Sequence, residues 1–152
     1  MRLYLIQHAE AKHEEEDPLR PLTEKGWTDA RRVVRHAADH AGIRVGRVIH
    51  SGKLRARQTA EVWREHLASV KVTEADGLDP TADPQVWLER LEQETEEVML
   101  VGHLPHLRRL ASRLLCGDEA RTVVAFQNGG IVCLQRDEEG WSLRWALTPE
   151  VV

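Results

Sequence analysis

The sequence has few cysteines and no long apolar segment. Cys116 and Cys133 are its only cysteines, and they form no CxxC pair, so the chain has neither a disulfide framework nor a cysteine-based metal pair. We expect both thiols to be reduced and to lie in the core. The apolar start covers only Leu3 to Ile6, much less than a secretory leader or the roughly 20 residues of a membrane helix require. These absences predict a cytoplasmic protein.

An excess of basic charge is also missing. The 152 residues carry 21 Lys and Arg against 25 Asp and Glu, which gives a net charge of −4. Such a chain has no general attraction to nucleic acid or to an anionic membrane. Its 41% hydrophobic and 30% charged residues are typical of one globular domain, and no linker or internal repeat interrupts it. We therefore expect a single, monomeric domain over residues 1–152 whose partner is a small molecule or a local site on a protein.

Apolar runs alternate with helical periods along most of the chain. Strands are expected at 3–6, 45–50, 70–73 and 98–101, and helices at 24–41, 56–67, 84–94 and 107–114. Thr23 is the expected N-cap of the first helix, and Gly117 ends the last one. Two further strands, 131–135 and 141–147, flank a turn at 137–140 and read as a hairpin. The pattern predicts an α/β, three-layer fold with a mostly parallel sheet flanked by helices and an antiparallel C-terminal hairpin.

A histidine follows the first predicted strand. His8 follows the buried run Leu3 to Ile6, and ligands of parallel sheets gather at the carboxyl ends of the strands. By itself this histidine could merely close the strand. Arg20, Arg55 and His103, however, fall at comparable places: before the first helix, after the second strand and after the strand at 98–101. All four side chains are expected on one rim.

This mixture of side chains suits phosphoryl transfer. The transferring group carries negative charge on its oxygens, which fixed cationic donors must meet while a nucleophile attacks in line. The guanidinium of Arg offers a planar fork for these oxygens. A neutral histidine can be the nucleophile, and a second histidine can donate hydrogen bonds to the phosphoryl group.

Four ordered motifs within residues 1 to about 110 resemble the histidine phosphatase superfamily, and in particular its small bacterial phosphohistidine phosphatases. The motifs are Gln7-His8-Ala9-Glu10-Ala11, Arg20-Pro21-Leu22-Thr23 with Gly26, Ser51-Gly52-Lys53-Leu54-Arg55-Ala56-Arg57-Gln58-Thr59, and Gly102-His103-Leu104-Pro105. The resemblance implies that His8 is transiently phosphorylated, that Arg55 and His103 clamp the phosphoryl group, and that Arg20 assists. It implies a phosphatase acting on a phosphorylated protein, most simply a phosphohistidine, or on a small phosphorylated compound.

One position departs from the family pattern. The residue before the nucleophile is Gln7, where the family carries Arg. An amide still donates hydrogen bonds but has no charge, and the loss of one transition-state donor costs about 10²–10³ in rate. We expect Gln7, Arg20 and Glu10 to bind the phosphate. A degenerate phosphate-binding or regulatory module with weak turnover is therefore the first alternative, and a phosphatase of small metabolites is the second.

No motif marks a general acid, and Glu10, Asp79 and Asp83 stay open as candidates. A phosphohistidine substrate would ease this demand, because solvent can protonate its imidazole before the labile P–N bond breaks.

Other features have simpler interpretations. His36 and His40 have the spacing of a metal pair but no third ligand, so no metal or cofactor is expected. His13 is expected on the surface, His106 is expected to be structural or peripheral, and residues 126–130 are expected to form a plain turn.

Overall fold

The computed structural model describes all 152 residues, with six strands and four α-helices that alternate as far as the fifth strand. The strands are β1 (Arg2–Gln7), β2 (Arg47–His50), β3 (Lys71–Glu74), β4 (Val98–Gly102), β5 (Ile131–Asp137) and β6 (Gly140–Leu147). The helices are α1 (Glu24–His40), α2 (Leu54–His66), α3 (Gln85–Gln93) and α4 (His106–Cys116), and a short 3₁₀ helix, Pro149–Val151, follows β6.

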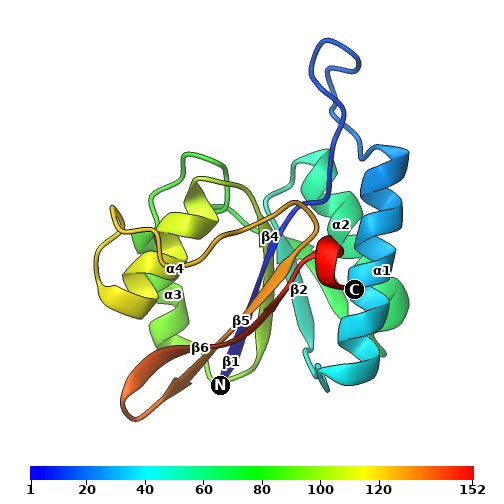
Figure 1. Cartoon of the computed structure of the whole chain (residues 1–152). Helices are drawn as coiled ribbons and strands as arrows, with labels where there is room; N and C mark the ends of the chain where they lie inside the picture. Colours follow the sequence, from blue (N-terminus) through cyan, green and yellow to red (C-terminus); the bar gives the residue numbers. More distant parts are fainter.

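The strands form one sheet in the order β3-β2-β4-β1-β5-β6. β3, β2, β4 and β1 pair in parallel, whereas β5 pairs antiparallel with both β1 and β6. Helices α1 and α2 cover one face of the sheet, and α3 and α4 cover the other (Figure 1). The expected α/β architecture, with its antiparallel C-terminal hairpin, is confirmed. The carboxyl ends of the four parallel strands therefore lie at the same end of the sheet.

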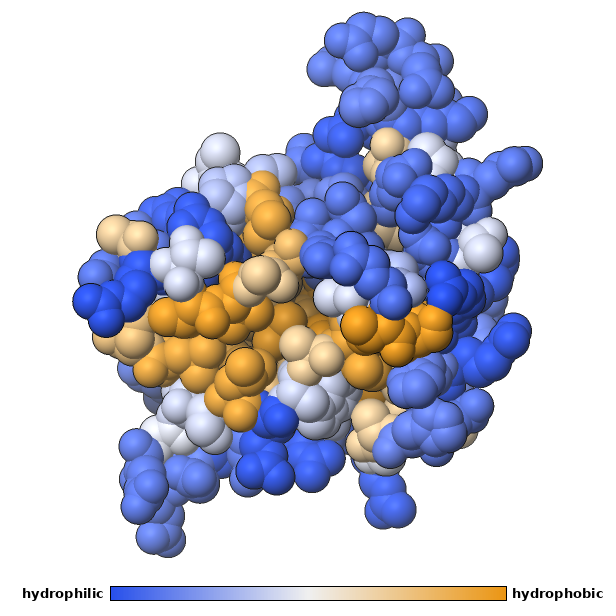
Figure 2. Space-filling model, viewed as in Figure 1, coloured by the Kyte–Doolittle hydropathy of each residue, from blue (hydrophilic) through white to orange (hydrophobic).

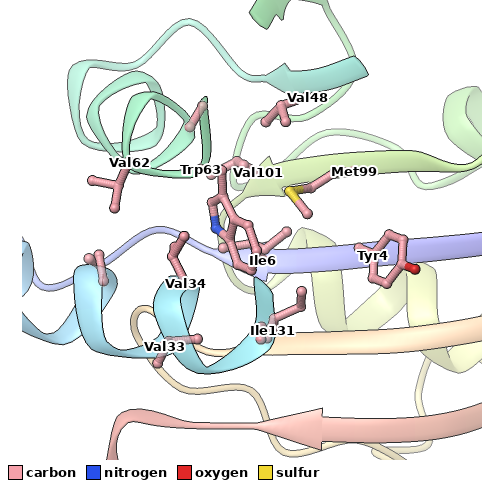
Figure 3. Close-up of a cluster of buried hydrophobic side chains, with 14 of the residues drawn as sticks. Tyr4, Ile6, Val33, Val34, Val48, Val62, Trp63, Met99, Val101 and Ile131 are labelled. Atoms are coloured by element: carbon pink, nitrogen blue, oxygen red, sulfur yellow. The ribbon is translucent and has the colours of Figure 1, made fainter. Parts of the chain in front are cut away.

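β1 lies inside the sheet and divides the core between its two faces. Tyr4 and Ile6 contribute to the cluster under α1 and α2, whereas Leu3 and Leu5 contribute to the cluster under α3 and α4. The first cluster also holds the fully buried Trp63 of α2 (Figure 3). Because β1 is buried on both faces and paired on both edges, the residue that follows it has little freedom.

The start of α1 is fixed by the expected cap. The Gly26 backbone N–H donates to Thr23 Oγ1 at 2.9 Å, and the Thr23 N–H donates to the carbonyl of Glu10 at 3.0 Å. The helix then buries Ala30, Val33 and Val34. Its N-terminus is thus tied directly to the loop that follows β1 and His8.

Two expectations need correction. β2 begins at Arg47 rather than at Val45, because only residues from Arg47 onward pair with β3 and β4, although Val45 is itself buried. Cys133 lies in the core as expected, but Cys116 is exposed, because it ends α4 where the helix leaves the core.

The surface is divided between polar and apolar regions. Hydrophilic side chains cover the loop that rises beyond the carboxyl end of β1 and the turn of the C-terminal hairpin, whereas apolar side chains form a band across the middle of this face, beside α4 (Figure 2). Leu143 and Val123 are among the exposed large hydrophobic residues. None of the helices has the length and apolarity that crossing a bilayer would need.

We expect Gly26→Ala to destabilise the protein by about 1–3 kcal/mol, because the added Cβ would lie 2.1 Å from the Glu10 carbonyl oxygen. The usual preference of helices for Ala over Gly is too small to offset a backbone clash. Gly46→Ala is the matched control, since its Cβ would meet nothing within 4 Å. Urea unfolding measures both variants. Equal stability of the two would show that α1 does not pack against the Glu10 loop in this way.

Candidate active site

His8 leaves the sheet at the carboxyl end of β1, directly beside β4. Its backbone N–H donates to the Gly102 carbonyl at 3.0 Å, which continues the parallel pairing by one residue. The imidazole is 8% exposed, and its Nδ1 lies 2.7 Å from the Ala9 carbonyl oxygen. A carbonyl oxygen only accepts, so Nδ1 carries the hydrogen. In the neutral ring, Nε2 then keeps its lone pair.

His103 follows β4 and lies against His8. The two ring centroids are 5.0 Å apart. Nε2 of His103 lies 2.6 Å from Ser51 Oγ, and its Nδ1 is buried without a hydrogen-bond partner. Sequence reasoning assigned Ser51 no role of its own, but in the structure its hydroxyl orients the second imidazole.

Burial keeps both imidazoles neutral. It lowers the pKa of His8 to about 4, although the hydrogen bond to Ala9 raises it, and the charges of Arg55 and Arg20 make smaller contributions in the lowering direction. It also lowers the pKa of His103 to about 3, where the charges of Arg55 and Lys53 act in the same direction. At neutral pH, His8 is therefore an uncharged base with a free nitrogen, which is the form a nucleophile needs.

Two guanidiniums lie within electrostatic reach of His8 and pair with no carboxylate. Burial, and after it the charge of Arg20, lowers the pKa of Arg55, whose Nε is buried without a partner. Arg20 Nε donates to the Lys12 carbonyl at 3.0 Å, and its backbone has a φ of 47°, which a residue with a side chain seldom adopts. Neither arginine takes part in the ion pairs of the chain. Two unpaired cations beside neutral imidazoles form a site for an anion.

A cavity of about 340 Å³ opens over His8, and we call it the His8 cavity. Glu10, Arg20 and Asn128 line it, and so does His13, which is exposed as expected. The cavity thus brings three of the sequence-predicted site residues together. Arg55 and His103 do not line the cavity, but the charge of Arg55 acts on His8 and the ring of His103 contacts that of His8.

Gln7 lies differently from the other predicted residues. It lines a neighbouring cavity of about 380 Å³, which we call the Gln7 cavity, and not the His8 cavity. Its Oε1 is buried and has no hydrogen-bond partner. A buried acceptor without a donor costs about 1–3 kcal/mol of stability.

The segment before β5 is part of the site and not a plain turn. Asn128 Nδ2 donates to the His8 carbonyl at 3.0 Å, and the Gly129 N–H donates to the same oxygen at 3.2 Å and to that of Gln7 at 3.0 Å. These bonds hold the main chain at the end of β1. Sequence reasoning missed this role because the segment has no motif and only spatial proximity reveals it.

The candidate general acids occupy different places. Glu10 lines the His8 cavity and accepts a hydrogen bond from Thr23 Oγ1 at 3.0 Å. The charge of Asp79 acts on both Arg55 and His106, whereas that of Asp83 acts on His106. Of the three candidates, Glu10 and Asp79 are therefore the ones near the anion site.

His106 is completely buried at the start of α4. Neither ring nitrogen has a hydrogen-bond partner, and burial lowers its pKa to about 4. Its backbone N–H donates to the Pro80 carbonyl at 3.1 Å, which ties α4 to the loop carrying Asp79. The rings of His36 and His40 contact each other on α1, and the chain holds no group of three or more His, Cys, Asp or Glu suited to a metal ion.

The sequence profile of the histidine phosphatase superfamily (branch 1) matches residues 3–81, just over half of the chain. The protein belongs to this superfamily. No curated protein matches the sequence.

Solved structures agree with this assignment. The protein histidine phosphatase SixA complexed with tungstate is 25% identical, with a TM-score of 0.83 over 98% of this chain and 97% of that one. A protein of Agrobacterium tumefaciens, provisionally described as phosphohistidine phosphatase SixA, is 26% identical, with a TM-score of 0.78 over 97% of each chain. The alpha-ribazole phosphatase of Shigella flexneri, at 17% identity, shares the fold, with a TM-score of 0.78 over 95% of each chain.

The buried histidines should make the superfamily member sensitive to acid. Between pH 6.5 and about 4, His8, His103 and His106 bind protons in the unfolded chain but not in the folded protein. The free energy of unfolding is therefore largest above pH 6.5 and falls as the pH is lowered below this value. At pH 5 each histidine accounts for a loss on the order of 2 kcal/mol. Urea unfolding at pH 7 and pH 5 should show a smaller acid loss in His106→Leu than in the parent, by about this amount. An unchanged difference between the two pH values would mean that His106 is not buried in its neutral form.

Proposed function

We propose that the protein is a metal-independent phosphatase that acts through a phosphohistidine at His8, with protein phosphohistidine as its substrate. The observation that carries the proposal is the state of His8: buried and neutral, with Nδ1 held by the Ala9 carbonyl and the unpaired charges of Arg55 and Arg20 nearby. A tetrahedral phosphoryl group suits this combination of a free nitrogen and two guanidiniums.

The reaction has two steps. Nε2 of His8 attacks phosphorus in line, and the bond between phosphorus and the leaving group breaks while the guanidiniums of Arg55 and Arg20 meet the charge on the phosphoryl oxygens. The phosphorylated imidazole keeps its hydrogen on Nδ1 and is a cation, so it becomes a good leaving group. Water then attacks phosphorus, and the bond between phosphorus and Nε2 breaks. Inorganic phosphate leaves with the oxygen and the protons of the water, one of which can pass to solvent. His8 is again neutral, with its hydrogen on Nδ1.

His103 acts beside the nucleophile. Its contact with His8 places it where it can donate a hydrogen bond to a phosphoryl oxygen, with Ser51 holding the other side of the ring. Burial lowers its pKa to about 3, so His103 is uncharged at neutral pH and only one of its ring nitrogens carries a hydrogen. Glu10 borders the same cavity and, with Arg20, completes our assignment of residues that bind the phosphate.

The choice of phosphohistidine rests on chemistry and similarity together. No motif marks a general acid for the site, and a P–N bond depends less on such an acid than a bond to an alkoxide does. The two SixA structures, at 25% and 26% identity, support the same choice. An exposed free thiol at Cys116 suits a reducing compartment, and we place the activity in the cytoplasm.

Gln7 favours a second candidate, a phosphate-binding module with weak turnover. The chain lacks the guanidinium that the superfamily places next to the nucleophile, and Gln7 lines a different cavity from His8. In that case the pocket would bind a phosphorylated group without releasing phosphate.

His8→Ala should abolish turnover, by about 10³-fold or more, while the fold survives, because the nucleophile has no substitute and the side chain lies at a strand end. Release of inorganic phosphate from phosphohistidine measures the loss, and circular dichroism checks the fold. His36→Ala on α1 is the control and should hydrolyse at the parental rate. Near-parental hydrolysis by His8→Ala would rule out the mechanism.

Gln7→Arg should raise the rate of hydrolysis of a simple phosphate ester about tenfold or more, because it restores a fixed cationic donor beside the nucleophile. Gln7→Ala is the companion variant. If both variants lose rate, Gln7 is an adapted part of the pocket, with Lys53, whose charge already acts on His103, supplying the cation.

A further inference from the structure

The peptide unit that joins His8 to Ala9 is held at both ends. Its carbonyl, on His8, accepts from Asn128 Nδ2 at 3.0 Å and from the Gly129 N–H at 3.2 Å. Its N–H, on Ala9, donates to Thr59 Oγ1 at 3.0 Å, although the two residues lie 50 positions apart. Both polar atoms of this peptide therefore have partners on distant segments, and Thr59 supplies the partner of the N–H.

The hydroxyl of Thr59 also contacts the main chain of Arg55. Oγ1 donates to the Arg55 carbonyl at 2.8 Å, four residues earlier in α2. Threonine often makes this bond in helices for local reasons alone. Here, however, an N–H can only donate and a carbonyl can only accept, so the hydroxyl must accept from Ala9 and donate to Arg55. The peptide of His8 is thus joined to the main chain of Arg55 by two hydrogen bonds of fixed direction.

This connection lies in the core, where water cannot replace it. Thr59 is 1% exposed, and Ala9 is fully buried. Without the hydroxyl, the Ala9 N–H would be buried and unpaired, so the peptide would turn toward another acceptor. The Ala9 carbonyl, which lies 2.7 Å from His8 Nδ1, would then move relative to the ring that it holds.

The neighbouring residue of α2 ties a second loop to the same helix. Gln58 Oε1 accepts from the Leu22 N–H at 2.8 Å, two residues after Arg20. α2 therefore carries Arg55 itself and, through two adjacent side chains, holds the loops of His8 and Arg20. Among these connections, that of Thr59 is the one that reaches the peptide of the nucleophile.

We propose that Thr59 is a positioning residue whose hydroxyl holds His8 in place relative to Arg55. The proposal rests on the phosphatase activity proposed above, in which both groups act on one phosphoryl group. Nε2 must attack in line while the guanidinium meets the phosphoryl oxygens, and a misplacement of about 1 Å can cost about 10² in rate. Thr59 holds the two groups in register before the substrate binds.

Thr59→Val and Thr59→Ser separate the hydroxyl from the volume of the side chain. Thr59→Val keeps the volume and loses both hydrogen bonds, whereas Thr59→Ser keeps the hydroxyl and loses a methyl group from the core. Ser112→Ala is the matched control. It removes another buried hydroxyl, which has no hydrogen-bond partner and lies on α4, across the sheet from α2 (Figure 1). Circular dichroism and urea unfolding check that each variant is folded.

The value of kcat for phosphohistidine should fall about tenfold or more in Thr59→Val, with KM changed less than about threefold because both guanidiniums keep their charges. Thr59→Ser and Ser112→Ala should keep kcat within about twofold of the parent. A purely structural role predicts instead that folded Thr59→Val works as well as the parent. That result, or equal losses of kcat in Thr59→Val and Thr59→Ser, would overturn the proposal.

A measurement without substrate tests the same role independently of turnover. The nitrogen chemical shifts of the His8 ring report which nitrogen carries the hydrogen and how strongly it is bonded to Ala9. These shifts should agree in the parent and Thr59→Ser, and should differ in Thr59→Val. Identical shifts in all three proteins would overturn the positioning role and leave the phosphatase intact. If the parent hydrolysed no phosphohistidine while the shifts changed as expected, the proposed function would fail and the anchoring of His8 by Thr59 would stand.

Discussion

The parallel pairing of β1 with β4 is the constraint on which the candidate site depends. It aligns Gln7 with Gly102, so His8 and His103 leave the sheet side by side although they lie far apart in the sequence. The bond from the His8 N–H to the Gly102 carbonyl carries the pairing one step beyond the strand. Because β1 is buried on both faces and paired on both edges, this alignment cannot shift without exposing core residues.

Burial at the carboxyl ends of β1 and β4 determines the protonation state of the two histidines. Removing His8 and His103 from water lowers the pKa of each ring, and the charges of Arg55 and Arg20 add to the effect on His8. The same burial leaves Arg55 Nε and His103 Nδ1 without partners. Unpaired donors of this kind destabilise the empty site, and an anion that satisfied them would recover part of that free energy. The unpaired donors thus lower the stability of the protein and leave a site prepared in advance for an anion.

Most of the fold could be predicted from the sequence, because strands buried on both faces give continuous apolar runs and amphipathic helices give a regular spacing of apolar residues. The start of β2 was misplaced because Val45 is buried but pairs with no neighbouring strand. Cys116 was misplaced because the end of α4 turns away from the core. Both facts depend on tertiary contacts. His8, Arg20, Arg55 and His103 could be singled out because ordered motifs surround them. Ser51 as the partner of His103, and Asn128 as the partner of the His8 carbonyl, could not, because these contacts cross between distant segments.

Gln7 shows where sequence reasoning stops. The sequence marks it as a missing charge, whereas the structure places it in a second cavity that shares Glu10 and Asn128 with the His8 cavity.

The central claim is that His8 carries the phosphoryl group during turnover, and it can be tested directly. Protein mixed with labelled phosphohistidine, quenched in base within the first turnover and digested, should yield an acid-labile phosphate on the peptide that contains His8, bonded to Nε2. That label should appear as inorganic phosphate when unlabelled substrate is added. Release of labelled phosphate at the full rate with no label on His8 would contradict the account.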